Sequence, residues 1–279
     1  MSNRLSWFII LMLVVGFIFL YGPMVSVVIY SFNDNKLATL WGGFSTRWYP
    51  ALLANDQMLR AAKHSLIIGV VSATFATTFG TIAGYVLARY RKFRGRTLFS
   101  GMVTAPLVMP EVITGLSLLL LFVAMKDLFG WPNRGLMTVI LAHITFTLSY
   151  VTIVMQSRFT TLDISLEEAA LDLGARPLKV FMVITLPIVA PAIISGWLLS
   201  FTISLDDLVI TSYTNGPGST TLPQVIFSAV RLGVNPSINA LATIIIAVVA
   251  FGVVTSHILM TRAERRRQRD IQMALQSNK

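Results

Sequence analysis

Long apolar runs separated by short polar segments dominate this sequence. A helix needs about 20 mostly apolar residues to cross the hydrocarbon core of a bilayer. Six runs reach that length, at approximately 7–31, 65–88, 100–124, 136–156, 180–204 and 239–261. The first run follows Arg4 as in a secretory signal peptide, but it is too long and lacks a small-residue cleavage site. The pattern therefore predicts an all-α membrane protein with six transmembrane helices, the first of them retained.

Composition supports a membrane environment. The 279 residues are 55% hydrophobic and 12% charged, with a mean hydropathy of +0.73, whereas soluble domains carry roughly 25% charged residues. The net charge of +10 would suit nucleic acid, but the basic residues lie in short blocks between apolar runs. Such blocks are typical of contact with a lipid bilayer, so no nucleic-acid partner is expected. Because the chain has no cysteine, it can form no disulfide and no thiolate metal site.

The basic residues also predict an orientation. If both termini are cytoplasmic, 15 of the 22 Lys and Arg residues lie in inside segments and seven lie outside. This bias agrees with the positive-inside rule, and an even number of spans places both ends on one side. We therefore expect a multi-pass protein with both termini in the cytoplasm.

The inside segment 157–179 is unusual, because its pattern predicts a short helix. Ser165 and Glu168 have the spacing of a capping box, and Gly174 and Pro177 are suited to ending this helix and opening the next one. Re-entry into the membrane would follow through Leu186-Pro187. One apolar stripe at helical spacing lies on the predicted helix, formed by Leu166, Ala169, Ala170 and Leu173.

Two roles for this amphipathic helix are open from the residues alone. It could lie on the lipid surface, or its small alanine side chains could allow a partner protein to approach closely. The acidic residues would be repelled by an anionic leaflet, which counts against lipid, but the physical arguments leave the two roles nearly even.

A longer motif carries a family resemblance. It consists of Glu168-Ala169-Ala170, then Gly174, then Ile184 and Leu186-Pro187. This spacing resembles the EAA loop of binding-protein-dependent ABC importer permeases of type I. The resemblance implies a type I ABC importer permease fold with a cytoplasmic coupling helix. It also implies that the motif residues couple the chain to an ATP-binding subunit.

The resemblance extends to the rest of the chain. Residues 109–115 and 204–211 are similar to segments of the spermidine/putrescine permeases, and nearly the whole chain resembles the putrescine-transporting members. The implied organisation is an N-terminal transmembrane helix and periplasmic loop (1–59), a type I transmembrane domain (60–258) and a basic cytoplasmic tail (259–279). The implied setting is the bacterial inner membrane. The implied partners are a homologous second permease subunit, two ATP-binding subunits that hold ATP and Mg, and a periplasmic polyamine-binding protein.

Three acidic residues are candidates for the substrate pathway. Glu111 lies inside the third apolar run directly after Pro110, and Asp206 and Asp207 close the fifth run. Ionisable groups in membrane segments cost about 2.5–3.5 kcal/mol and usually face a cavity or a partner, and carboxylates suit a polycation. Adjacent residues on a helix point in different directions, so we expect only one of the Asp pair to face a pore. Alternatively, Glu111 caps a broken helix or pairs with a partner subunit, and the Asp pair caps a loop.

Other chemistry is not indicated. His143 and His257 sit in apolar runs without further ligands at metal spacing, so we interpret both as hydrogen-bonded packing residues rather than metal ligands. No phosphate-binding loop motif occurs, which predicts a non-enzyme that needs separate ATPase chains. Pro187 and Pro191 are expected to bend the fifth helix. Rival functions are a type I permease for another small solute, a stand-alone ion-coupled carrier with Glu111 as proton relay, and a membrane scaffold.

Overall fold

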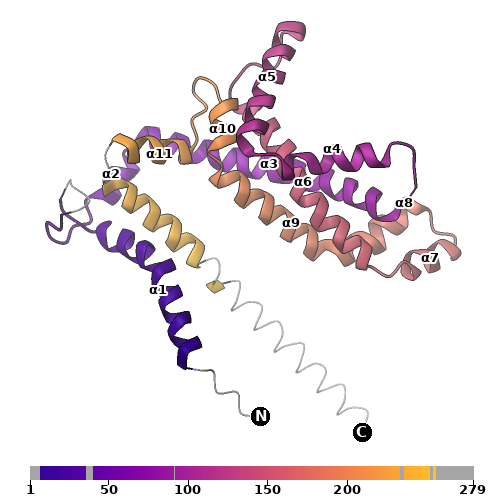
Figure 1. Cartoon of the computed structure of the whole chain (residues 1–279), viewed down its shortest axis with the longest axis horizontal. Coiled ribbons are helices and arrows are strands. Elements are labelled where there is room, and N and C mark those ends of the chain that lie inside the picture. The colour runs from indigo at the N-terminus through magenta and orange to yellow at the C-terminus, as the bar shows by residue number, and fades with distance from the viewer. Residues whose placement is uncertain (1–6, 36–39, 91, 233–235, 252–253, 256–279) are drawn as a thin grey trace. The chain divides into compact units, whose positions relative to one another are not determined.

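The computed structural model describes residues 7–35, 40–90, 92–232, 236–251 and 254–255. Within these residues the secondary structure is helical apart from one isolated antiparallel bridge between Asn33 and Phe44, which confirms the predicted all-α class. The helices, labelled in Figure 1, are α1 (Trp7–Tyr30), α2 (Trp48–Leu53), α3 (Asp56–Arg89), α4 (Arg96–Val108), α5 (Glu111–Phe129), α6 (Leu136–Thr161), α7 (Ser165–Asp172), α8 (Pro177–Val180), α9 (Leu186–Asp206), α10 (Val209–Thr214) and α11 (Leu222–Leu232). A π-helical segment, η1 (Phe181–Thr185), joins α8 to α9. A further apolar helix occupies Pro236–Phe251.

The chain divides into two compact units. Unit 1 comprises Met1–Asp56 and Ser228–Lys279, and unit 2 comprises Gln57–Phe227. In unit 1, α1 carries no charged residue and none of its residues is buried, as expected of a helix surrounded by lipid. The segment after α1 folds around Asn33, whose Oδ1 accepts hydrogen bonds from the backbone N–H groups of Asn35 and Gly42. Trp48 Nε1 donates to the Asn33 carbonyl oxygen at 2.6 Å, which ties α2 to this loop.

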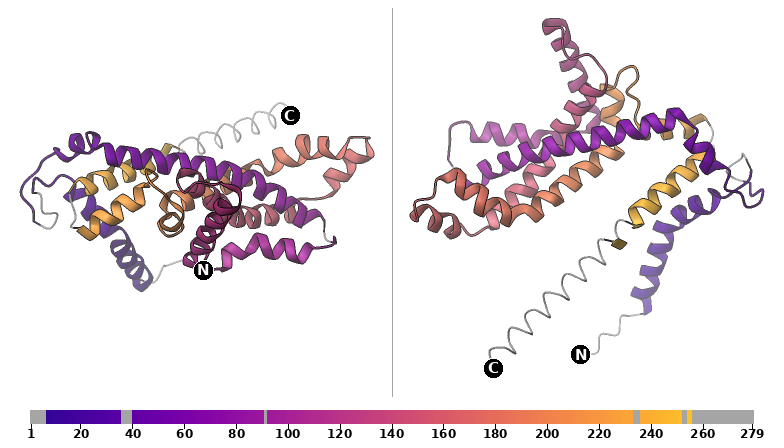
Figure 2. Two further views of the ribbon diagram at one scale, coloured as in Figure 1. Left: turned by 90° about the horizontal axis from the view of Figure 1, so that it is seen from above. Right: turned by 180° about the vertical axis from the view of Figure 1, so that it is seen from behind.

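Unit 2 is built on close packing of α3, α6 and α9, the three long helices seen together in Figure 2. Glycines make the close approach possible. A Cβ atom on Gly80 would lie 2.8 Å from the Val151 side chain, and one on Gly84 would lie 2.8 Å from the backbone N of Gln156. The same residues of α6 also meet α9, because Val189 of α9 packs into a fully buried cluster with Val151, Met155 and Phe159. Small residues let membrane helices approach at backbone distance, and this gives unit 2 a tightly packed centre.

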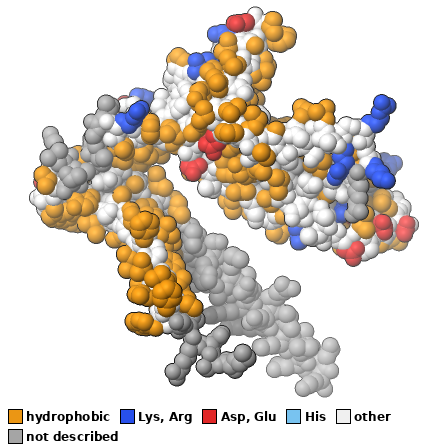
Figure 3. All heavy atoms as spheres, viewed as in Figure 1, with side chains coloured by type: hydrophobic (Ala, Val, Ile, Leu, Met, Phe, Trp, Pro, Cys, Tyr) orange, Lys and Arg blue, Asp and Glu red, His pale blue; other side chains and the backbone are white. Residues whose placement is uncertain are grey.

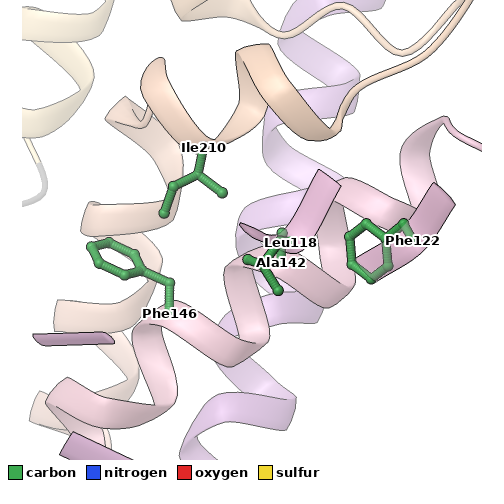
Figure 4. Packing of buried hydrophobic residues seen from close by; sticks show 5 residues of the cluster. All are labelled: Leu118, Phe122, Ala142, Phe146 and Ile210. Carbon is green, nitrogen blue, oxygen red and sulfur yellow. The ribbon is translucent and has the colours of Figure 1, made fainter. Parts of the chain in front are cut away.

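A second cluster joins α5, α6 and α10. Figure 4 shows its five buried members, which are Leu118 and Phe122 of α5, Ala142 and Phe146 of α6, and Ile210 of α10. Gly115 lies at the α5–α10 contact, where an added Cβ would come within 2.8 Å of the Tyr213 ring and 3.3 Å of the Ile210 Cα. The first turns of α5 are thereby held against the short helix α10.

Five helical segments are long and apolar enough to cross a membrane, and each overlaps a predicted span: Trp7–Tyr30, Asp56–Arg89, Glu111–Phe129, Leu136–Thr161 and Pro177–Asp206. The sixth prediction, 239–261, is described only as far as the helix Pro236–Phe251 and residues 254–255, so the count of six stays a prediction. His257 and the basic tail 259–279 lie outside the described residues. The domain boundaries expected from the sequence also stay predictions.

The third span differs from its prediction. The run 100–124 is not one helix, because the chain breaks at Met109, whose ψ of 140° is extended, and at Pro110. Proline disfavours the helical conformation for the residue before it and lacks a backbone N–H donor, and at Pro110 these two restrictions coincide with the break. The result is α4 with 13 residues and α5 with 19. Since a span needs about 20 residues, α4 alone is too short to cross the hydrocarbon core.

Exposed apolar and charged side chains occupy different parts of the surface. Large apolar side chains are exposed along α1, α4 and α5, and Figure 3 shows hydrophobic side chains over the exposed sides of the long helices. Many of the basic and acidic side chains of unit 2 gather at the end that carries α7. An apolar belt with a charged end is the surface expected of a protein embedded in a bilayer.

Candidate functional site

The helix α7 ends as the sequence predicts. Gly174 has a left-handed φ of +81°, and its N–H donates to the Leu171 carbonyl at 2.8 Å while the Ala175 N–H donates to the Ala170 carbonyl at 3.1 Å. These two bonds form a Schellman motif, which satisfies carbonyls at the end of a helix and requires the left-handed residue that glycine supplies. Pro177 then opens α8, as expected.

The predicted capping box does not form at the start of α7. Ser165 is the first helical residue, and its hydroxyl makes no capping bond with the helix. Instead, the carboxylate of Asp163 accepts a hydrogen bond from the Ser165 backbone N–H at 3.0 Å. Hydrogen bonds from the backbone and the side chain of Ser165 lower the pKa of Asp163. The acidic residue two positions earlier therefore supplies the acceptor, and it is a stronger acceptor than a hydroxyl because it is charged.

One face of α7 is open. The side chains of Leu166 and Leu173 are 46% and 89% exposed, and Ala169 and Glu168 are exposed as well. Of the predicted apolar stripe, Ala170 alone is buried. The other three members, Leu166, Ala169 and Leu173, are exposed in the described part of the chain and present an apolar surface with acidic neighbours.

The opposite face of α7 is held by an ion pair that sequence reasoning missed. Glu167 Oε1 accepts hydrogen bonds from Arg89 Nη2 at 2.8 Å and from Thr185 Oγ1 at 3.0 Å. Arg89 and Glu167 are 78 residues apart in sequence. No local pattern in the sequence links these two residues.

The remaining residues of the motif lie where α7 and α8 connect to α9. Ile184 belongs to η1, and Leu186 and Pro187 are the first two residues of α9. Ile184 and Leu186 are half-buried and Pro187 is exposed. The Leu186 N–H donates to the Phe181 carbonyl five residues earlier, so a π-helical turn precedes the proline that lacks an N–H donor. Such turns are rare and occur often at functional positions.

The candidate pathway acids occupy two neighbouring regions. Glu111 is the first residue of α5, directly after the break at Pro110, and it is exposed. Asp206 is the last residue of α9 and is also exposed. Because Gly115 presses the next turn of α5 against α10, the start of α5 and the chain after Asp206 belong to one packed region.

The side chain of Asp207 is buried, unlike that of Asp206. Its side chain is 5% exposed and lies 3.2 Å from His143 Nε2. Its carboxylate accepts hydrogen bonds from the backbone N–H groups of Ile210 and Thr211, so it caps α10. The Thr211 hydroxyl adds a third bond at 2.8 Å. The two adjacent acids therefore face different surroundings, as their spacing predicts, and the buried one is engaged within the protein.

His143 is the centre of this buried network. Its Nδ1 lies 2.6 Å from Ser204 Oγ and its Nε2 lies 2.9 Å from Thr211 Oγ1. The interpretation of His143 as a hydrogen-bonded packing residue is confirmed. Among the described residues no three His, Asp or Glu side chains gather in a metal-binding cluster.

Comparison with known proteins agrees with this geometry. Residues 76–269 match the family model described as "Binding-protein-dependent transport system inner membrane component". The chain is 59% identical to the putrescine transport system permease protein PotI of Escherichia coli (strain K12), over 97% of this chain and 96% of that protein. It is 40% identical to the spermidine/putrescine transport system permease protein PotC of the same strain, over 86% of this chain and 89% of that protein.

Solved structures share the fold. A bacterial ABC transporter involved in the import of the acidic polysaccharide alginate matches with a TM-score of 0.70 at 17% identity, covering 92% of this chain and 98% of that chain. The MetNI methionine ABC transporter matches with a TM-score of 0.58 at 15% identity, covering 74% of this chain and 95% of that chain. At these identities the likeness concerns the fold alone. Together with the match over residues 76–269, these findings show that the chain belongs to the family of binding-protein-dependent transport system inner membrane components.

Proposed function

We propose that this chain is the permease subunit of an ATP-driven importer that moves putrescine across the bacterial inner membrane. The observation that carries the substrate assignment is the 59% identity to the putrescine permease PotI over 97% of this chain. At 40% identity, the relative named for spermidine and putrescine is more distant and points to the same class of polyamine cations.

The proposed site of coupling to ATP hydrolysis is α7 with the segment that follows it. Its residues are Glu168, Ala169, Ala170, Gly174, Ile184, Leu186 and Pro187. The exposure of Glu168 and Asp172 beside Leu166 and Leu173 favours a protein partner over lipid. Carboxylates on this face would be repelled by an anionic leaflet, whereas a basic or polar cleft in a partner would accept them.

The complete importer would contain this chain, a homologous second permease subunit, two ATP-binding subunits and a periplasmic polyamine-binding protein. Both termini and α7 would face the cytoplasm, where the excess of Lys and Arg lies. ATP and Mg would be held by the ATP-binding subunits, and this chain would conduct and couple rather than hydrolyse. Closure of those subunits would push α7 and switch the permease pair between inward- and outward-facing states.

Glu111 and Asp206 are the acids proposed to contact the diamine, because both are exposed and each lies a short distance along the chain from the contact between α5 and α10. Carboxylates replace part of the hydration of an ammonium group through charge-assisted hydrogen bonds. Asp207 would shape the pathway from behind, by fixing α10.

Uptake of labelled putrescine into proteoliposomes that contain the full complex tests this function. We expect uptake that requires ATP, the binding protein and the ATP-binding subunits together. If the complex takes up no labelled putrescine but takes up another labelled solute, the chain is a permease for that solute. Transport by this chain alone, without ATP-binding subunits, would instead identify a stand-alone carrier.

A further inference from the structure

A buried ion pair joins α7 to three other segments. Arg89, the last residue of α3, donates from Nη2 to Glu167 Oε1 at 2.8 Å and from Nη1 to the Phe159 carbonyl of α6 at 3.0 Å. The side chains of Arg89 and Glu167 are 11% and 10% exposed. Thr185, which closes η1, donates to the same carboxylate oxygen at 3.0 Å. One carboxylate of α7 is thus bonded, directly or through Arg89, to α3, α6 and the start of α9.

These contacts are made by one of the two buried residues of α7. Glu167 and Ala170 are the buried residues among its eight, and the other side chains are partly or fully exposed. An alanine methyl offers little apolar area, so burial alone holds this helix weakly. The hydrogen bonds of Glu167 are charge-assisted and about twice as strong as neutral ones.

The cluster of Arg89, Glu167 and Thr185 is better explained by a role in positioning α7 than by a contribution to the stability of the fold. Replacing a buried ion pair with apolar residues of similar size is often neutral or stabilising, so such a pair is poor support for a stabilising role. Here each partner comes from a different segment, and the threonine is the buried residue between Ile184 and Leu186 of the motif. The π-helical turn places Thr185 on the buried side, where it reaches Glu167.

We propose that Arg89, Glu167 and Thr185 are positioning residues that fix α7 to α3, α6 and α9, so that a displacement of α7 moves these helices as one body. This inference rests on the proposed function of α7 as the coupling element. It assigns the transmission of the movement to Arg89, Glu167 and Thr185, none of which is a residue of the motif. They lie on the buried side of α7, next to the motif residue Ala170.

The variants Thr185→Val and Glu167→Gln test the cluster with little change in size. The first removes one hydroxyl and keeps both charges, and the second keeps an acceptor but removes the negative charge. Thr185→Ser restores the hydroxyl. Thr152→Val is a matched control, because Thr152 is also fully buried but its hydroxyl donates to the Leu148 carbonyl within its own helix.

Two measurements on the full chain decide the proposal. Because the chain has no cysteine, spin labels at Leu173→Cys on the open side and Ser157→Cys on α6 report the distance between α7 and α6. Thr185→Val and Glu167→Gln should broaden this distance distribution. The population of molecules with α7 detached should rise roughly tenfold, because each variant weakens a hydrogen bond to a charged group. In the assembled importer, both variants should lower the putrescine taken up per ATP hydrolysed, while Thr185→Ser and Thr152→Val retain the original value.

The proposal is overturned if both variants keep the original distance distribution, or if both keep the original ratio of uptake to ATP hydrolysis. A complex of unsubstituted chains that moves no putrescine would contradict the proposed function instead. In that case the distance measurement still decides whether these three residues hold α7.

Discussion

Gly174 ends α7 in a conformation that other residues adopt only at a cost. Its φ is +81°, and a Cβ atom built on it would meet no atom within 4 Å. Substitution by alanine is therefore penalised through the backbone alone, by about 1–2 kcal/mol for an L-residue in the left-handed region. That cost corresponds to a factor of roughly 5–30 in the equilibrium between the formed and the unwound end of α7.

Unwinding would remove the two hydrogen bonds that close the helix end, from Gly174 to Leu171 and from Ala175 to Ala170. We therefore expect Gly174→Ala to insert normally but to weaken association with the ATP-binding subunits and to reduce ATP-driven uptake. Gly174→Leu should have a larger effect, since it also adds a side chain beside the open face. Gly174→Asn should be milder than Gly174→Ala, because asparagine tolerates the left-handed conformation.

Association is measured by co-purification of the ATP-binding subunits with the tagged permease, and transport by putrescine uptake into vesicles. Gly218→Ala is the matched control. Gly218 has a φ of +75°, and a Cβ atom built on it would also meet no atom within 4 Å. It lies in the turn before α11, more than 40 residues after α7 in the sequence. Normal co-purification and uptake for Gly174→Ala and Gly174→Leu would refute the assignment of α7, as would an equal loss of co-purification in Gly218→Ala.

Three further predictions follow from the packing and the acids. Gly84→Ala should lower the thermal unfolding midpoint in detergent, by the equivalent of about 1–3 kcal/mol, because its Cβ would lie 2.8 Å from the α6 backbone; Gly101→Ala, with open space around it, should not. Asp206→Asn should reduce putrescine uptake at an unchanged unfolding midpoint. Asp207→Asn should instead lower that midpoint, by the equivalent of about 1–3 kcal/mol, because it weakens a buried hydrogen-bond network. The opposite result would make Asp207 the substrate contact and Asp206 the structural residue. Because the pKa of Asp163 is lowered from 3.8 in the folded chain, its contribution to α7 is complete at neutral pH and is lost only as the pH falls below that value. Protection of the first turn of α7 from amide hydrogen exchange should therefore not change through this carboxyl between pH 5 and pH 8. If protection does change in that range, and Asp163→Asn abolishes the change, Asp163 is not the fully charged acceptor described above.

Local patterns explain why much of the fold could be predicted. Five predicted spans overlap long apolar helices, because a run of about 20 apolar residues in a bilayer has few alternatives to a helix. The end of α7 at Gly174 was predicted for a similar reason, since the left-handed position needs glycine. The third span shows the limit of hydropathy, although Pro110 already raises a broken helix at Glu111 as an alternative. Hydropathy alone continues through Met109 and Pro110, and the backbone restriction at proline divides the run.

The candidate site was predictable only in part. The open stripe of α7 follows from helical spacing, but its start did not form the expected capping box, because the carboxylate of Asp163 competes successfully for the first backbone N–H. The adjacent acids Asp206 and Asp207 were expected to face different directions. The pattern did not say which is exposed, and the packing of His143 and Thr211 around Asp207 determines that.

The sequence by itself determined the membrane environment, the helical class, the position of α7 and the motif that places the chain in its family. Each of these depends on composition or on residues close together along the chain. Only the tertiary structure decided that Arg89 and Glu167, 78 residues apart, form a buried pair beneath α7, and that Thr185 completes it. Such a contact depends on how α3, α6 and α9 pack, and no periodicity or spacing within one segment encodes the neighbours that another segment brings.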